Sequence, residues 1–125
     1  MSGCNVVDSS AWLEYLANTK QAAHFAGALE DTDNLIVPVV TIYEVFKKVL
    51  RERTEGDAMQ VVSLMQAGTV VDIDQPLALD AARYALPLAD SIIYATAVSR
   101  GATLWTQDGH FRQLPNVRYY PKKNK

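Results

Sequence analysis

Short apolar runs alternate with stretches of helical spacing along this 125-residue chain, and that alternation most constrains how it can fold. Five apolar runs read as short buried strands, at residues 5–8, 35–37, 70–73, 103–105 and 117–120. The intervening stretches favour helices, at residues 11–16, 21–30, 41–50, 58–65, 77–86 and 90–99, with Gly101 as a stop for the last. Strands that alternate with helices predict a layered α/β domain with a mostly parallel sheet.

The length predicts a single domain that spans residues 1–125. The sequence begins without a basic, apolar leader, and no segment approaches the roughly 20 apolar residues of a membrane span. The lone cysteine, Cys4, favours a buried thiol in a reducing cytoplasm. The net charge of −2 argues weakly against a protein that coats nucleic acid without specificity, although basic residues cluster locally.

Four acids, here called the acidic quartet, occupy positions that such a fold would bring together: Asp8, Glu44, Asp90 and Asp108. Asp8 and Asp108 follow apolar runs, and parallel strands place their carboxyl ends at one edge of the sheet. Glu44 and Asp90 lie in helical stretches that could face that edge. Carboxylates gathered without an obvious His or Cys partner indicate a site for Mg²⁺ or Mn²⁺, and thereby phosphodiester chemistry.

Each acid also has an ordinary structural interpretation. Asp8 and Asp90 suit helix starts, where a carboxylate interacts favourably with the helix dipole. Asp108 precedes Gly109, which is a common turn pair. One metal site nevertheless explains all four positions at once. Small hydroxyls beside the acids, suited to hold a water or a carboxylate in place, are those of Ser9, Ser10 and Thr106.

Glu44 has a further ordinary interpretation, because Lys47 and Lys48 follow it at the spacing of surface ion pairs on a helix. Together with Arg51, these lysines instead predict a basic track along which a phosphate backbone would reach the metal. The histidines, His24 and His110, could serve as proton shuttles, but a surface or partly packed position is favoured for both. No aromatic cluster requires a base-stacking platform.

Four segments together resemble the PIN-domain nucleases, and among them the VapC-type toxins of toxin–antitoxin pairs; they span residues 6–13, 40–45, 88–97 and 104–111. Each motif alone is weak, but the ordered set is specific and the resemblance covers nearly the whole chain. It implies a three-layer α/β/α fold with a five-stranded parallel sheet, and it makes the quartet the metal ligands and Thr106 their supporting hydroxyl. It also implies a homodimer that is held inactive by a cognate antitoxin protein, with operator DNA bound only through that antitoxin.

These observations predict a toxin that cleaves RNA in a metal-dependent reaction, using one or two ions. A rival from another class is a catalytically weak binding module that acts mainly in an antitoxin–DNA repressor complex. An aspartate-nucleophile phosphatase fits poorly, because Ser10 stands where that class needs a second Asp. Cleavage of DNA, as by a flap-nuclease relative, stays open, although the chain lacks the extra length used to bind duplexes.

Overall fold

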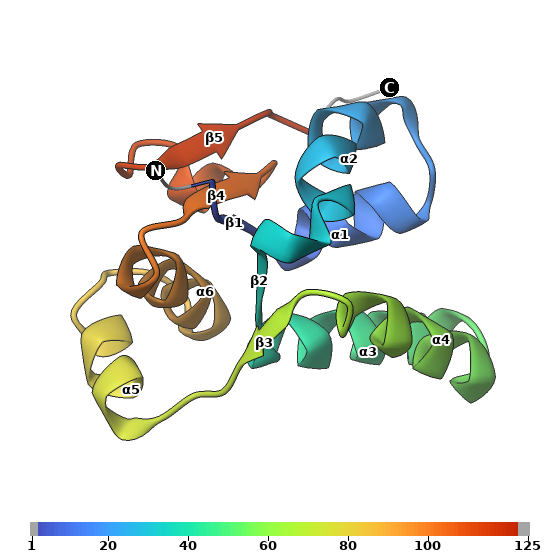
Figure 1. The fold of residues 1–125 in the computed structure, drawn as a ribbon, viewed down its shortest axis with the longest axis horizontal. Helices are drawn as coiled ribbons and strands as arrows, with labels where there is room; N and C mark the ends of the chain where they lie inside the picture. The colour runs from blue at the N-terminus through green and yellow to red at the C-terminus, as the bar shows by residue number, and fades with distance from the viewer. Residues whose placement is uncertain (1–2, 123–125) are drawn as a thin grey trace.

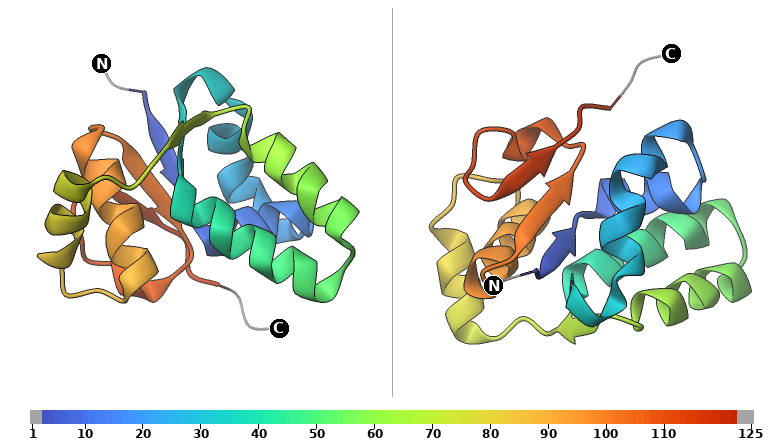
Figure 2. Two further views of the ribbon diagram at one scale, coloured as in Figure 1. Left: turned by 90° about the horizontal axis from the view of Figure 1, so that it is seen from below. Right: turned by 45° about the horizontal axis from the view of Figure 1, so that its top comes forward.

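A computed structural model describes residues 3–122 and contains a sheet of five strands. The strands are β1 (Asn5–Val7), β2 (Leu35–Pro38), β3 (Thr69–Val71), β4 (Thr103–Thr106) and β5 (Val117–Tyr119). Every neighbouring pair is parallel, and the order across the sheet is β3-β2-β1-β4-β5. Strands β2 and β3 therefore lie on one side of β1, and β4 and β5 lie on its other side (Figures 1 and 2).

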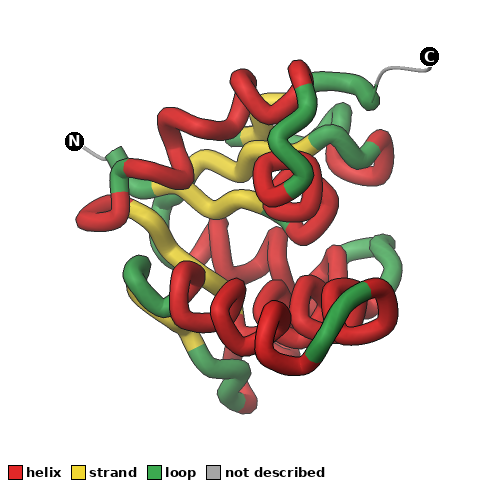
Figure 3. Tube along the Cα trace, turned by 90° about the vertical axis from the view of Figure 1, so that its right-hand side faces the viewer, coloured by secondary structure: helices red, strands yellow, loops and turns green. Residues whose placement is uncertain are grey.

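Six α-helices connect the strands: α1 (Ser9–Leu16), α2 (Ala23–Glu30), α3 (Val39–Glu52), α4 (Glu55–Met65), α5 (Gln75–Ala82) and α6 (Leu88–Ser99). Helices α1 to α4 lie on one side of the strands and α5 and α6 on the other (Figure 1), and the strands run between helices in the tube view (Figure 3). The structure is thus the expected three-layer α/β/α fold. Among the described residues, no helix has the length and apolar character needed to cross a membrane.

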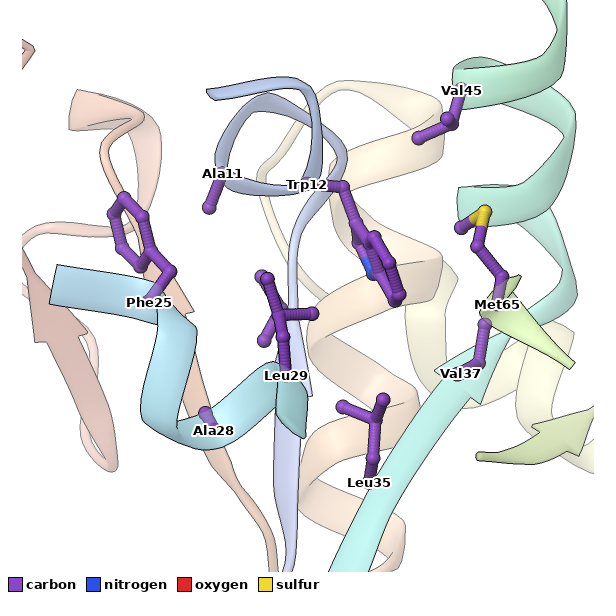
Figure 4. Packing of buried hydrophobic residues seen from close by; sticks show 10 residues of the cluster. Ala11, Trp12, Phe25, Ala28, Leu29, Leu35, Val37, Val45 and Met65 are labelled. Carbon is purple, nitrogen blue, oxygen red and sulfur yellow. The ribbon is translucent and has the colours of Figure 1, made fainter. Parts of the chain in front are cut away.

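Consecutive residues of β1 divide the core between the two faces of the sheet, because side chains alternate along a strand. Val7 packs in the cluster between the sheet and helices α1 to α4, which also contains Trp12, Phe25 and Met65 (Figure 4). Val6 packs on the opposite face in the cluster that includes Ile93 of α6. A central strand that is covered on both faces is apolar on both sides, which is what Val6 and Val7 show.

The sequence placed all five strands and six helices, with differences at their ends. The helix expected at residues 77–86 begins earlier, at Gln75, because Asp74 caps it and Pro76 suits its first turn. It also ends earlier, at Ala82, with Arg83 as its C-cap. The helix expected at residues 21–30 is divided into a short 3-10 turn (η1, Lys20–Ala22) and α2.

Candidate active site at the carboxyl edge of the sheet

The site lies at the carboxyl ends of β1 and β4, where the strand order changes from one side of β1 to the other. Strands β1 and β4 are neighbours, with Val7 opposite Trp105, and Asp8 and Asp108 follow them at the same edge. The backbone N–H of Asp8 donates to the carbonyl of Trp105 at 3.1 Å, which fixes the two strand ends together. Crevices beyond strand ends at such a switch point are the usual ligand sites of open α/β sheets.

Asp8 is a buried carboxylate at the start of α1, with a side chain that is 3% exposed. It caps the helix by accepting from the N–H of Ala11 at 3.1 Å, and the Ser10 hydroxyl donates to it at 3.0 Å. Burial raises the pKa of Asp8 to about 7, although hydrogen bonds from Ala11, Thr106 and Ser10 oppose this effect. Asp8 is therefore both a helix cap and a carboxylate whose negative charge lacks compensation.

Glu44 projects from α3, the helix with the strongest amphipathic pattern. Its Oε1 accepts from the Ser9 hydroxyl at 2.6 Å. Among the described residues Lys48 pairs instead with Glu52 at 2.8 Å, and the Lys47 amine lies 3.3 Å from the Tyr43 hydroxyl. The ordinary interpretation of Glu44 as a partner of these lysines is therefore not what the structure shows. A neutral hydroxyl orients its carboxylate toward the cleft without neutralising it.

Asp90 and Asp108 meet through His110. Asp108 caps the 3-10 turn η3 (Gly109–Phe111), and its own N–H donates to the buried hydroxyl of Thr106 at 2.8 Å. The Nδ1 atom of His110 lies 2.8 Å from Oδ2 of Asp90 and 3.2 Å from Oδ1 of Asp108. Burial raises the pKa of Asp90, and the hydrogen bond to Asp90, with the charge of Asp108, raises the pKa of His110.

The four acids line one cleft of about 390 Å³. Its other lining residues are Ser9, Ser10, Leu13, Tyr43, Lys47, Lys48 and Arg51. The basic residues that the sequence suggested as contacts for an RNA backbone thus lie on α3 at the same cleft as the acids. Helix α3 forms a basic wall of the cleft, because it contributes all three basic side chains, together with Glu44. Cations and carboxylates in one cleft suit a phosphate ester held beside a metal ion.

The residues present fit a divalent cation. One oxygen each from Asp90 and Asp108 and one nitrogen of His110 lie within 4.8 Å of one another. Asp8 has no basic partner within 4.0 Å in the described part of the chain, and Asp108 adds to the unfavourable charge around it. A buried carboxylate of this kind is stabilised by a nearby cation, and carboxylate oxygens are the ligands that Mg²⁺ and Mn²⁺ prefer.

Sequence reasoning missed the contact between His110 and the acids. His110 is on the surface, as favoured, with a side chain that is 56% exposed, yet η3 folds it back onto Asp90. The feature of the sequence that could have indicated this contact is that His110 stands two residues after Asp108. The other histidine, His24, is exposed on α2 and stacks on Tyr120 with ring centroids 4.3 Å apart, outside the cleft lining.

Comparison with models of known families identifies the family to which the chain belongs. The PIN domain model matches residues 6–117, which is most of the chain. The chain therefore belongs to the PIN domain family. No curated protein sequence gives a significant match.

Solved structures with the same fold cover nearly all of the chain. A toxin–antitoxin complex from Klebsiella pneumoniae is 22% identical, with a TM-score of 0.75 over 94% of this chain and 99% of that one. VapBC from Salmonella typhimurium, solved bound to DNA, is 16% identical, with a TM-score of 0.71 over 97% and 98%. VapBC2 from Rickettsia felis, bound to a DNA fragment from its promoter, is 10% identical, with a TM-score of 0.70 over 94% and 98%.

Proposed function

We propose that this protein is a metal-dependent endoribonuclease and the toxin of a VapC-type toxin–antitoxin pair. The observation that carries the proposal is the convergence of the acidic quartet on one cleft with a basic wall. The PIN domain match and the toxin–antitoxin complexes that share the fold support it. We further propose that residues 1–125 act as one domain in the cytoplasm.

The acidic quartet would supply oxygen ligands to Mg²⁺ or Mn²⁺. When bound, such an ion supplies Lewis-acid chemistry that activates water and stabilises negative charge on the phosphate. The protein's own contribution is to hold the carboxylates in position without pairing them with a lysine or arginine in the described part of the chain. Three neutral hydroxyls do this: Ser9 on Glu44, Ser10 on Asp8, and Thr106, which binds the amide of Asp108.

The basic wall of the cleft suggests how the substrate is oriented. Lys47, Lys48 and Arg51 lie within two turns of α3 on the side of Glu44 and would contact successive phosphates of the RNA backbone. A single-stranded or loop segment suits the cleft, because an exposed strand can bring its phosphate to the acids without opening a helix. The binding would therefore weaken as salt concentration rises.

Partners follow from the same proposal. A cognate antitoxin would bind the toxin and block its cleft, and the pair would reach operator DNA only through the antitoxin. Two of the solved relatives are VapBC complexes bound to DNA, in keeping with this arrangement. We also propose a homodimer, which light scattering of the purified protein tests; a particle with the mass of one chain would contradict it.

Cleavage of a mixed RNA pool by purified protein tests the activity. We expect discrete cuts with Mg²⁺ or Mn²⁺ that disappear with a chelator and in Asp90→Asn. The matched control is Asp80→Asn, which removes an exposed acid that pairs with Arg83 on α5, away from the cleft. Cuts that persist in Asp90→Asn, or that do not need metal, would contradict the proposal.

The second candidate is a catalytically weak binding module that works mainly in an antitoxin–DNA repressor complex. The DNA-bound VapBC structures among the relatives favour keeping it. It predicts that wild type and Asp90→Asn both leave the RNA pool intact while each supports DNA binding by the antitoxin equally well. Metal-dependent cuts by wild type alone would exclude it.

A further inference from the structure

His110 is the one nitrogen donor among the oxygen ligands of the candidate metal site in the described part of the chain. Its position is set by the backbone, because its N–H donates to Oδ1 of Asp108 at 2.9 Å. The next residue, Phe111, is fully buried in the core and thereby holds the turn η3 against the rest of the domain. The imidazole is therefore fixed at its base and reaches the acids with its Nδ1 atom, while much of the ring faces solvent.

The distances from His110 to the two acids match those between neighbouring ligands of one ion. In an octahedral site with bonds of about 2.1 Å, adjacent ligand atoms lie about 3 Å apart. Nδ1 of His110 is 2.8 Å from the Asp90 oxygen and 3.2 Å from the Asp108 oxygen. The same distances also describe hydrogen bonds, so geometry alone allows two roles: a ligand, or a positively charged partner of the two acids.

Starting from the proposed metal-dependent activity, we propose that Nδ1 of His110 is a metal ligand beside Asp90 and Asp108, and that it makes the site prefer Mn²⁺ over Mg²⁺. Mg²⁺ is a hard ion that favours oxygen ligands, and imidazole nitrogen favours first-row transition ions. A site built from carboxylates alone would lack this source of discrimination. His110 is thus a residue that determines metal specificity, in addition to the four acids.

The two roles of His110 predict opposite effects on metal binding. A ligand adds affinity, so its removal weakens the binding of Mn²⁺ most. A positively charged partner instead occupies the place of the cation and repels it. Its removal would leave the affinity for both ions unchanged or would strengthen both.

Calorimetric titration of the purified full chain with Mn²⁺ and with Mg²⁺ separates these outcomes. We expect His110→Ala to weaken Mn²⁺ binding by at least about tenfold, the scale of loss when a group that supports a metal site is removed. The loss for Mg²⁺ should be several-fold smaller. The control is His24→Ala, which removes the only other histidine, exposed on α2 and outside the cleft, and should change neither affinity.

Electron-spin-echo envelope modulation of bound Mn²⁺ gives a second readout, which detects a nitrogen ligand directly. Nitrogen bonded to the ion should appear in wild type and His24→Ala and be absent from His110→Ala. Equal losses for both ions, unchanged or tighter binding by His110→Ala, or no nitrogen signal in wild type would overturn the proposal.

The failure of this inference can be told apart from failure of the proposed function. RNA cleavage with Mn²⁺ but no bonded nitrogen would remove the role of His110 and leave the nuclease. Bonded nitrogen without cleavage would keep the ligand and remove the nuclease. A wild-type protein that binds neither ion would overturn both.

Discussion

Asp8 makes the folding stability of the metal-free protein depend on pH. Its folded pKa of about 7 lies above the ordinary value of 3.8, so the folded state binds the proton more tightly than the unfolded chain. The stabilisation that Asp8 contributes is therefore fully present below about pH 4 and is lost as pH rises through about 7. The difference corresponds to about 4 kcal/mol, at roughly 1.4 kcal/mol per pKa unit.

The perturbation that isolates this effect is Asp8→Asn, which keeps an oxygen to accept from the Ala11 N–H and removes the charge. Urea unfolding with chelator present should show wild type losing about 3 kcal/mol more than the variant between about pH 4.5 and pH 7.5. The raised pKa values of Asp90 and His110 act in the same direction in both proteins and cancel in the comparison. At neutral pH the variant should be the more stable protein.

The matched control is Asp74→Asn on α5. Asp74 caps its helix as Asp8 does, by accepting from the Leu77 N–H at 3.0 Å, but it is exposed. Its variant should follow the wild-type pH profile. Wild type and Asp8→Asn curves that run parallel within about 1 kcal/mol would refute the reasoning, because burial would then not favour the protonated form of Asp8.

Two further changes test how the scaffold holds the site. In Gly68→Ala a Cβ would lie 2.8 Å from the Leu35 carbonyl oxygen, so we expect a loss of about 1–3 kcal/mol in urea unfolding. At Gly27, inside α2, an added Cβ meets nothing within 4 Å, so Gly27→Ala should instead stabilise the protein by roughly 0.5–1 kcal/mol. Equal changes in stability for the two variants would contradict the packing described around Gly68. Thr106→Val leaves the Asp108 amide without its acceptor and should cost about 1–3 kcal/mol, whereas Thr106→Ser should retain most of the stability.

The sequence predicts that Asp8 and Asp108 lie at one edge of the sheet, because each follows a strand of a parallel sheet. Parallel strands bring their carboxyl ends to one edge, so Asp8 and Asp108 had to lie near each other once β1 and β4 were neighbours. That the two strands are neighbours depends on strand order, which the apolar runs do not encode. The family resemblance, and not the periodicity of apolar residues, indicated that both strand ends belong to one site.

Side-chain partners were harder to predict, because several partners compete within reach of a long side chain. Helical spacing favoured Lys47 and Lys48 for Glu44, but Ser9 comes from α1 at a separation of 35 residues. The partners of His110 were also hard to predict. It lies in the turn η3, where a change of one or two backbone angles points the imidazole ring in another direction. The sequence singled out the hydroxyls of Ser9, Ser10 and Thr106 beside the acids, but not which acid each one contacts, and it did not indicate the contact of His110.

The choice of partners explains how the acids can remain available to a cation. Had a lysine paired with Glu44, the carboxylate would be neutralised and its attraction for a metal largely lost. Hydroxyl groups from Ser9 and Ser10 instead orient the carboxylates while leaving their charge intact. The site therefore keeps an electrostatic penalty in the metal-free fold, indicated by the raised pKa of Asp8, and the proposed cation would relieve it. The proposed metal affinity and the expected loss of stability toward neutral pH thus have one cause, the uncompensated charge of these acids.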